Sequence, residues 1–116
     1  MANRRAQGER SHPAAHGGTA WRTPETTDLF EAILSLETVG EAERFFRDLC
    51  TIAELDALTH RWHVARLLDE ALPYLEVAKR TGASTTTVTR VAHWLRHGEG
   101  GYRTALDRRM PLSPTA

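Results

Sequence analysis

An all-α fold is predicted by three features of this 116-residue sequence. No stretch alternates apolar and polar residues with the period of two that marks a half-buried strand. Apolar residues instead recur at spacings of three and four, as on one face of an amphipathic helix. Residues 38–41 and 51–54 each have the T-x-x-E spacing of a capping box, which starts a helix. We therefore expect a helical bundle with a helix-turn-helix towards its C-terminal end.

The N-terminal part of the chain predicts an arm followed by three helices. Residues 1–22 are rich in Gly, Ala, His and Arg with little to bury, so we expect a disordered basic arm. The first helix begins after Thr23, whose hydroxyl can cap it, with Pro24 at the first helical position. The two capping boxes then predict a helix ending near residue 49 and a longer one ending near residue 70. The side chains expected to face inward on these two helices are Ala42, Phe45, Phe46 and Leu49, then Leu55, Leu58, Trp62, Ala65 and Leu68.

Residues 74–95, with the sequence YLEVAKRTGASTTTVTRVAHWL, predict two short helices joined by a tight turn. Val77 gives the first helix a buried stripe, and Val88 and Val91 give the second helix its own. Gly82 lies between them, where a chain that ends one helix and starts another usually needs a positive φ. Ser84 can accept a hydrogen bond from the free N–H groups of the second helix. Together these features predict a helix-turn-helix.

The second helix of this motif has the side chains of a DNA-reading helix on its exposed side. Short hydroxyls at a helix N-terminus reach phosphates and base edges, and an arginine binds guanine or phosphate. Threonine is a mediocre helix former, so a run of it on an exposed face indicates a binding function. The alternative is a hairpin packed inside a larger bundle, with a merely solvated threonine face. The residues predicted to bind double-stranded DNA are Lys79, Arg80, Ser84, Thr85, Thr86, Thr89, Arg90 and His93.

The distribution of charge supports this interpretation, although the formal net charge is zero. Residues 79–98 contain four Lys or Arg and no Asp or Glu, and the arm carries four arginines against one glutamate. Residues 25–78 contain twelve acidic residues against four arginines. The local field, rather than the net charge, decides whether a phosphate backbone is attracted. Positive charge therefore collects on the predicted DNA-binding segment.

Several classes of function are disfavoured by the sequence. No apolar run is long enough to span a membrane, and the single cysteine, Cys50, allows no intrachain disulfide, which fits a reducing cytoplasm. No Gly-rich phosphate loop or paired acid motif is present, so we expect neither an enzyme nor a cofactor. The pairs His12/His16 and His93/His97 have the i, i+4 spacing of metal ligands. Without a cysteine or carboxylate nearby in sequence, exposed or phosphate-facing histidines are favoured over a metal site.

A homodimer is predicted from the large apolar side chains on short helices. Phe30, Phe45, Phe46 and Trp62 are large for the core of so small a monomer. A dimer that interleaves these helices would bury them, and two DNA-reading helices one turn of DNA apart also need a dimer. The helical domain is expected over residues 23–102, with Tyr102 folded back onto the core. Residues 103–116 are expected to form a tail that begins with a short helix over 103–109.

Three segments of the sequence resemble the YerC/YecD group of Trp-repressor-like proteins. They are LFEAILSLETVGEAERFFRDLCTIAEL at 29–55, RWHVARLLDE at 61–70 and RTGASTTTVTRV at 80–91, and GEGGY at 98–102 belongs with them. The resemblance covers about residues 24–102. It implies an all-helical, intertwined dimer that carries helix-turn-helix segments and regulates transcription, as a repressor does.

The resemblance also implies positions that touch a ligand in the tryptophan-sensing repressors of this superfamily. Thr51, Arg61 and Arg90 match those positions, whereas Val91 and Trp94 replace a glycine and a serine. A branched side chain and an indole in the ligand's place predict a filled pocket and argue against tryptophan binding. Residues 71–73, Ala-Leu-Pro, also replace the usual Gly-rich turn and polar cap before the helix-turn-helix. That junction is predicted to be stiffer and less well capped.

The sequence therefore predicts a dimeric, sequence-specific DNA-binding regulator of transcription. The alternative function is a dimeric protein–protein interaction module whose helix-turn-helix no longer reads DNA.

Overall fold

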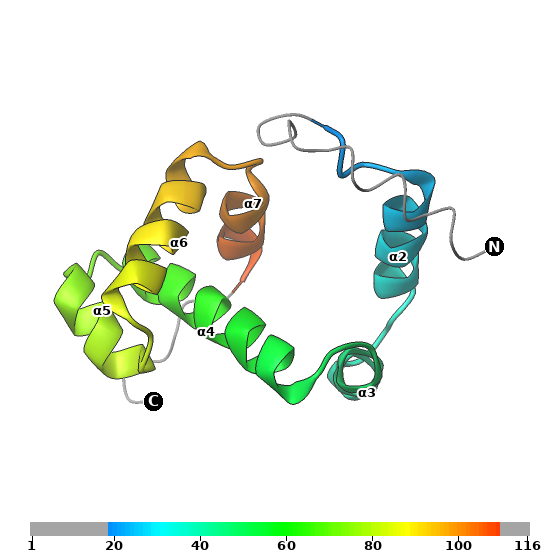
Figure 1. The fold of residues 1–116 in the computed structure, drawn as a ribbon, viewed down its shortest axis with the longest axis horizontal. Helices are drawn as coiled ribbons and strands as arrows, with labels where there is room; N and C mark the ends of the chain where they lie inside the picture. The colour runs from blue at the N-terminus through cyan, green and yellow to red at the C-terminus, as the bar shows by residue number, and fades with distance from the viewer. Residues whose placement is uncertain (1–18, 110–116) are drawn as a thin grey trace. The chain divides into compact units, whose positions relative to one another are not determined.

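The computed structural model describes residues 19–109, which form six helices and no strand (Figure 1). The predicted arm therefore lies almost entirely outside the described residues. The described residues fall into two compact units, 19–46 and 47–109. In the described part of the chain, no helix is both long and apolar enough to cross a membrane. The all-α prediction is confirmed.

The first unit contains α2 (Pro24–Leu34) and most of α3 (Val39–Leu49). As predicted, Thr23 caps α2: its hydroxyl accepts a 3.1 Å hydrogen bond from the Thr26 N–H, and the Thr26 hydroxyl accepts one of 2.8 Å from the Thr23 N–H. The Thr38 hydroxyl likewise accepts from the Glu41 N–H at 3.0 Å. The Glu41 carboxylate, however, accepts from the N–H of Glu37 rather than of Thr38, so the capping box at 38–41 is only half formed.

Neither α2 nor α3 contains a fully buried side chain. Phe30 is 47% exposed, and Phe45 and Phe46 are half-buried with their rings edge to face at 5.6 Å between centroids. Leu49, predicted to face inward, is 51% exposed. The helical period identifies an apolar face correctly, but one copy of the chain leaves much of that face open to solvent.

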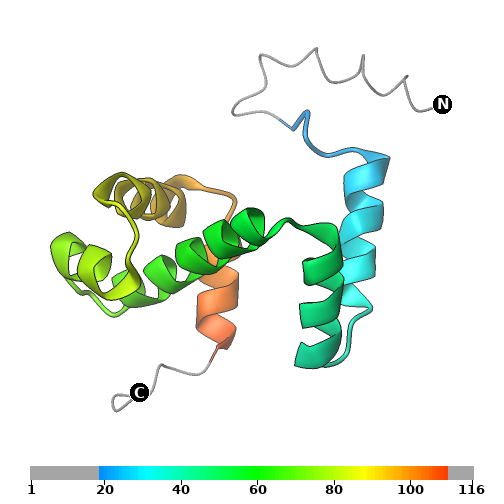
Figure 2. The same ribbon diagram turned by 60° about the horizontal axis from the view of Figure 1, so that its bottom comes forward.

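The second unit is built on α4 (Ile52–Asp69), which contacts all three later helices, α5 (Tyr74–Thr81), α6 (Thr85–His97) and α7 (Gly101–Arg108) (Figures 1 and 2). The predicted capping box that starts α4 is confirmed, with Thr51 and Glu54 exchanging hydrogen bonds of 3.0 and 2.9 Å. The buried residues that form the core are Val64, Ala65, Leu67, Val77, Val88, Val91 and Leu106. All of those from α4 lie in its C-terminal half.

The inward face predicted for α4 is only partly correct. Ala65 is buried, and Trp62 and Leu68 pack against the core. Leu58 is 42% exposed, and the first turns of α4 carry no buried side chain. Val64 and Leu67, which the helical pattern did not single out, are buried instead.

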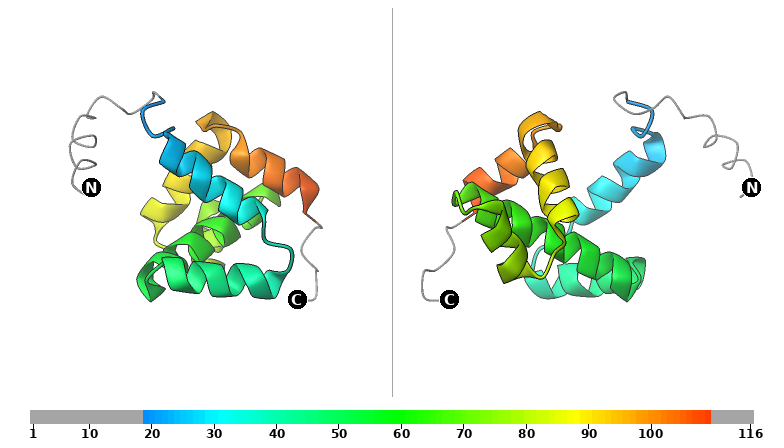
Figure 3. Two further views of the ribbon diagram at one scale, coloured as in Figure 1. Left: turned by 90° about the vertical axis from the view of Figure 1, so that its right-hand side faces the viewer. Right: turned by 60° about the vertical axis from the view of Figure 1, so that its left-hand side comes forward.

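The last helix, α7, drawn in orange in Figure 3, begins earlier than predicted and contributes a side chain to the core. Gly100 takes a left-handed φ of 88° and precedes α7, which starts at Gly101 rather than at 103. The expected domain boundary after Tyr102 thus falls inside a helix whose Leu106 belongs to the core. Tyr102 folds back as predicted, stacked on Trp62 with ring centroids 6.5 Å apart. Arg103 ties α7 to α4 through a 3.0 Å ion pair with Asp69.

Candidate nucleic-acid interface and adjoining pocket

The turn between α5 and α6 has the geometry that the sequence predicts. Gly82 has φ 78°, and its N–H donates to the Ala78 carbonyl at 2.9 Å, which closes α5. A Cβ at Gly82 would meet no atom within 4 Å, so the requirement for glycine comes from the backbone angle and not from space. The Ala83 N–H donates to the Thr81 hydroxyl at 3.1 Å. These hydrogen bonds fix the angle at which α6 leaves the turn.

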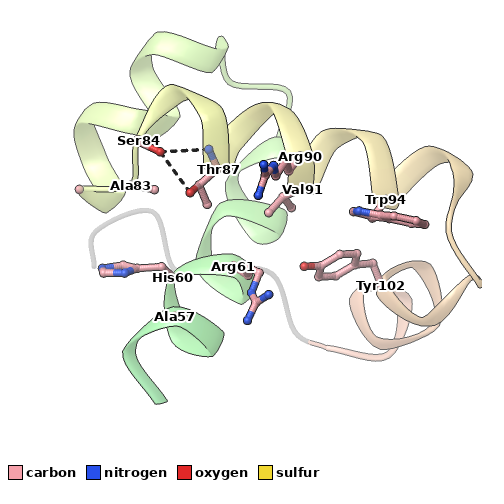
Figure 4. A pocket seen from close by; sticks show the side chains of 11 residues that line it. Ala57, His60, Arg61, Ala83, Ser84, Thr87, Arg90, Val91, Trp94 and Tyr102 are labelled. Carbon is pink, nitrogen blue, oxygen red and sulfur yellow. Dashed lines mark hydrogen bonds between the residues drawn. The ribbon is translucent and has the colours of Figure 1, made fainter. Parts of the chain in front are cut away.

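The N-terminus of α6 is capped by Ser84, as predicted. The Ser84 hydroxyl accepts a hydrogen bond from the Thr87 N–H at 3.1 Å and lies 3.2 Å from the Thr87 hydroxyl (Figure 4). The N–H groups at the start of a helix have no partner within the helix, and they carry the positive end of its dipole. Thr85 and Thr86 are exposed and lie at this end, so their hydroxyls and the backbone N–H groups beside them can bind an anion such as a phosphate.

The opposite side of α6 holds the helix firmly against the core. Val88 and Val91 are 0% and 2% exposed, and Ala92, which the apolar spacing did not single out, is 4% exposed. By contrast, every residue predicted to contact DNA is exposed, namely Lys79, Arg80, Ser84, Thr85, Thr86, Thr89, Arg90 and His93. Arg80 makes a 2.9 Å ion pair with Glu76 one turn earlier on α5. The structure thus exposes the predicted set on the helix-turn-helix.

A pocket of about 520 Å³ lies beside this motif, between α4, α6 and the start of α7 (Figure 4). Arg61 from α4 and Arg90 from α6 both line it, so two different helices each contribute a positive charge to its wall. The full lining is Ala57, His60, Arg61, Gly82, Ala83, Ser84, Thr87, Arg90, Val91, Trp94 and Tyr102. The chemistry of this lining, cationic on one side and aromatic on another, suits an amphipathic anion.

The prediction that this pocket is filled is wrong. Val91 and Trp94 do line it, but the Trp94 side chain is 56% exposed at the surface rather than packed into the interior. Thr51 does not join the lining, and its hydroxyl caps α4. Of the four residues assigned to a ligand-pocket remnant, the structure brings together Arg61, Val91 and Trp94 and leaves Thr51 apart.

Sequence reasoning missed several residues of the pocket. His60 shares a face of α4 with Ala57, three positions earlier, and this helical spacing was the available signal. Thr87 was one of a threonine run and had no feature to separate it from its neighbours. Burial raises the pKa of the Tyr102 phenol, while the charge of nearby Arg61 acts in the opposite direction. The phenol is therefore neutral at pH 7 and can donate a hydrogen bond into the pocket.

Comparison with known proteins places this arrangement in a family. A family model described as Trp repressor protein matches residues 25–110. The chain belongs to the Trp repressor family. It is 47% identical over 87 residues to YerC of Bacillus subtilis (strain 168), an alignment that covers 75% of this chain and 84% of YerC.

Two solved structures share the fold. A TrpR-like protein from Eubacterium eligens superposes with a TM-score of 0.75 at 43% identity, over 78% of this chain and 94% of that one. A putative Trp repressor from Staphylococcus aureus gives a TM-score of 0.73 at 39% identity, over 76% and 88% of the two chains. The fold of this Trp repressor family member is therefore Trp-repressor-like, and the family is one of regulators rather than of enzymes.

The junction before α5 has an unusual backbone in this family member. Ala71 has φ 66°, a left-handed conformation that non-glycine residues seldom adopt. Its N–H donates to the Leu68 carbonyl at 2.9 Å, and the Leu72 N–H donates to the Leu67 carbonyl at 3.4 Å. This is the hydrogen-bond pattern of a Schellman motif that ends α4, with alanine in place of the usual glycine. Pro73 then precedes α5 without a side-chain cap, as predicted.

Proposed function

We propose that this protein is a homodimeric, sequence-specific regulator of transcription that binds double-stranded DNA through α6. One observation supports the proposal above all others. The buried side chains of Val88 and Val91 hold α6 against the core. The other face of α6 exposes hydroxyl and basic side chains beside the N-terminal end of the helix. A helix held in this way can enter the major groove without an ordering cost.

The expected contacts follow from the position of each residue along α6. Ser84 and Thr86 lie at the positive end of the helix dipole and contact the phosphate backbone. Thr85 and Thr89, one turn apart on the exposed side, contact base edges. Arg90 lies deeper along the helix, next to buried Val91, and points to the side that lines the pocket. We therefore assign Arg90 to a phosphate rather than to a guanine.

Dimerisation is supported by the apolar side chains that one copy of the chain leaves exposed. Phe30, Leu49, Ile52 and Leu58 are each between 42% and 52% exposed. Surfaces of this kind on a small protein mark an interface. A two-fold dimer presents two copies of α6 to successive turns of the DNA, so dimerisation and DNA reading support each other.

A protein–protein interaction module is the second candidate function. It is favoured by two large apolar side chains exposed on the helix-turn-helix, Leu75 at 71% and Trp94 at 56%. A partner that buries them would bind with little dependence on salt. DNA binding instead releases counterions from the phosphates and weakens steeply as salt increases.

The proposal is tested by selecting bound sequences from a random DNA pool and measuring affinity for the selected site by gel shift. Thr85→Ala and Thr89→Ala, which each remove an interaction with a base, are expected to weaken binding by about 1–3 kcal/mol and to relax the preference at one position. Arg90→Ala is expected to weaken all sequences evenly and to lower the salt slope by about one unit for each phosphate that is no longer neutralised. Arg44→Ala, on α3, removes the same charge outside the motif and serves as the control. Unchanged affinity in all three α6 variants would remove the proposed DNA-reading helix.

A further inference from the structure

Two histidine side chains lie one helical turn apart at the C-terminal end of α6. The ring centroids of His93 and His97 are 5.1 Å apart, the rings are tilted by 48°, and both residues are exposed. An ion about 2.1 Å from a ring nitrogen lies about 3.2 Å from the centre of that ring, so two imidazoles on one tetrahedral ion have centres about 5 Å apart. The separation of these rings already matches that of two ligands on one ion.

The C-terminal end of α6 favours a cation beside the pair, although residues 79–98 carry a net positive charge. His97 is the last residue of α6, where the helix dipole carries partial negative charge. Arg96 would repel a metal ion, but its guanidinium donates a 3.2 Å hydrogen bond to the Tyr74 hydroxyl on α5 and is held there. The His93 ring packs edge to face with the Trp94 indole, with centroids 5.1 Å apart, which limits its rotamers. Less side-chain entropy of His93 would therefore be lost when an ion binds.

We propose that His93 and His97 together bind one divalent transition-metal ion of the Zn²⁺, Ni²⁺ or Cu²⁺ class. Imidazole nitrogen is a preferred ligand of these ions, unlike Mg²⁺ or Ca²⁺, which prefer oxygen. No group of three or more His, Cys, Asp or Glu within residues 19–109 is arranged to hold a metal. The chain thus supplies two ligands and water the others, and the affinity is lower than that of a structural zinc site. This inference stands independently of DNA binding.

The test is calorimetric titration of the full chain with Zn²⁺. The parent protein carries His12→Gln and His16→Gln, because these residues form another i, i+4 pair in the sequence. We expect one ion per chain, and at least tenfold weaker binding in His93→Gln and in His97→Gln. His63→Gln, an exposed histidine on α4, is the matched control and should bind as the parent does.

A relocated pair separates ligation from an indirect effect. In the double variant His97→Gln with Thr89→His, the exposed position 89 lies one turn before His93, so the i, i+4 geometry is restored and binding should return. Circular dichroism of each variant checks that the helices are intact. The proposal is overturned if the parent shows no saturable binding, if binding survives loss of either histidine, or if the relocated pair fails to restore it.

Discussion

Replacing Ala71 by glycine is expected to raise the free energy of unfolding, although it removes a methyl group. Ala71 occupies the left-handed position of the Schellman motif that ends α4, with φ 66°. This conformation costs an L-residue about 1–2 kcal/mol, and glycine avoids that cost. Glycine also lowers the free energy of unfolding by about 0.5–1 kcal/mol, because it gives the unfolded chain more conformational entropy. Since Ala71 is exposed and contributes little packing, the net gain is about 0.5–1 kcal/mol.

Thermal unfolding monitored by circular dichroism measures this gain as a rise of about 2–8 °C in Tm. Protein concentration must be held constant, because the stability of a dimer depends on it. Ala57→Gly makes the same chemical change inside α4, where it should lower stability by about 1 kcal/mol. If Ala71→Gly lowers Tm as Ala57→Gly does, the strain attributed to Ala71 is not present in the folded protein.

Three further outcomes are expected. Sedimentation at micromolar concentration should show a homodimer, and a single 13.0 kDa species would contradict dimerisation. Phe46→Ala should lower the free energy of unfolding by about 3–5 kcal/mol, because dimerisation buries the half-exposed Phe46 ring. The pocket is open, but Val91 and Trp94 replace in its wall the glycine and serine of the tryptophan-sensing repressors, so calorimetry should detect no binding of free tryptophan. A micromolar dissociation constant would show that the changed lining does not exclude this ligand. Burial raises the pKa of Tyr102 above 10.0, so the stability it provides is present below pH 10.0 and is lost as pH rises through the folded-state value. The free energy of unfolding of Tyr102→Phe should therefore fall less at alkaline pH than that of the wild type. Equal decreases in the two proteins would contradict the role given to Tyr102.

Features set by local hydrogen bonds were predictable from the sequence. The caps at Thr23, Thr51 and Ser84 and the left-handed turn at Gly82 each depend on residues within a few positions of one another. The helix period also identified the residues that lock α6 to the core. These interactions leave a direct signature in the order of residues, because backbone N–H and C=O groups near helix ends must find partners.

Features set by tertiary packing were not predictable in the same way. The sequence predicts a last short helix from residue 103, whereas Gly100, with its positive φ, directly precedes α7, which begins at Gly101. Leu58 fits the helical stripe of α4 but is 42% exposed. The direction of the Trp94 indole depends on its rotamer, so the sequence could not show that the pocket stays open. Each of these depends on what lies opposite a side chain rather than on its neighbours in sequence.

The central claim, that α6 is a DNA-reading helix, is tested most directly by the salt dependence of binding to the selected DNA site. A dimer that neutralises about 6–10 phosphates should lose about 10³–10⁵ in affinity between about 50 and 200 mM salt. Arg90→Ala should reduce the slope of log K against log salt by about one unit for each phosphate that the arginine neutralises, while the Arg44→Ala control keeps the wild-type slope. A nearly flat salt dependence would contradict the central claim, and a slope that Arg90→Ala leaves unchanged would contradict the assignment of Arg90 to a phosphate.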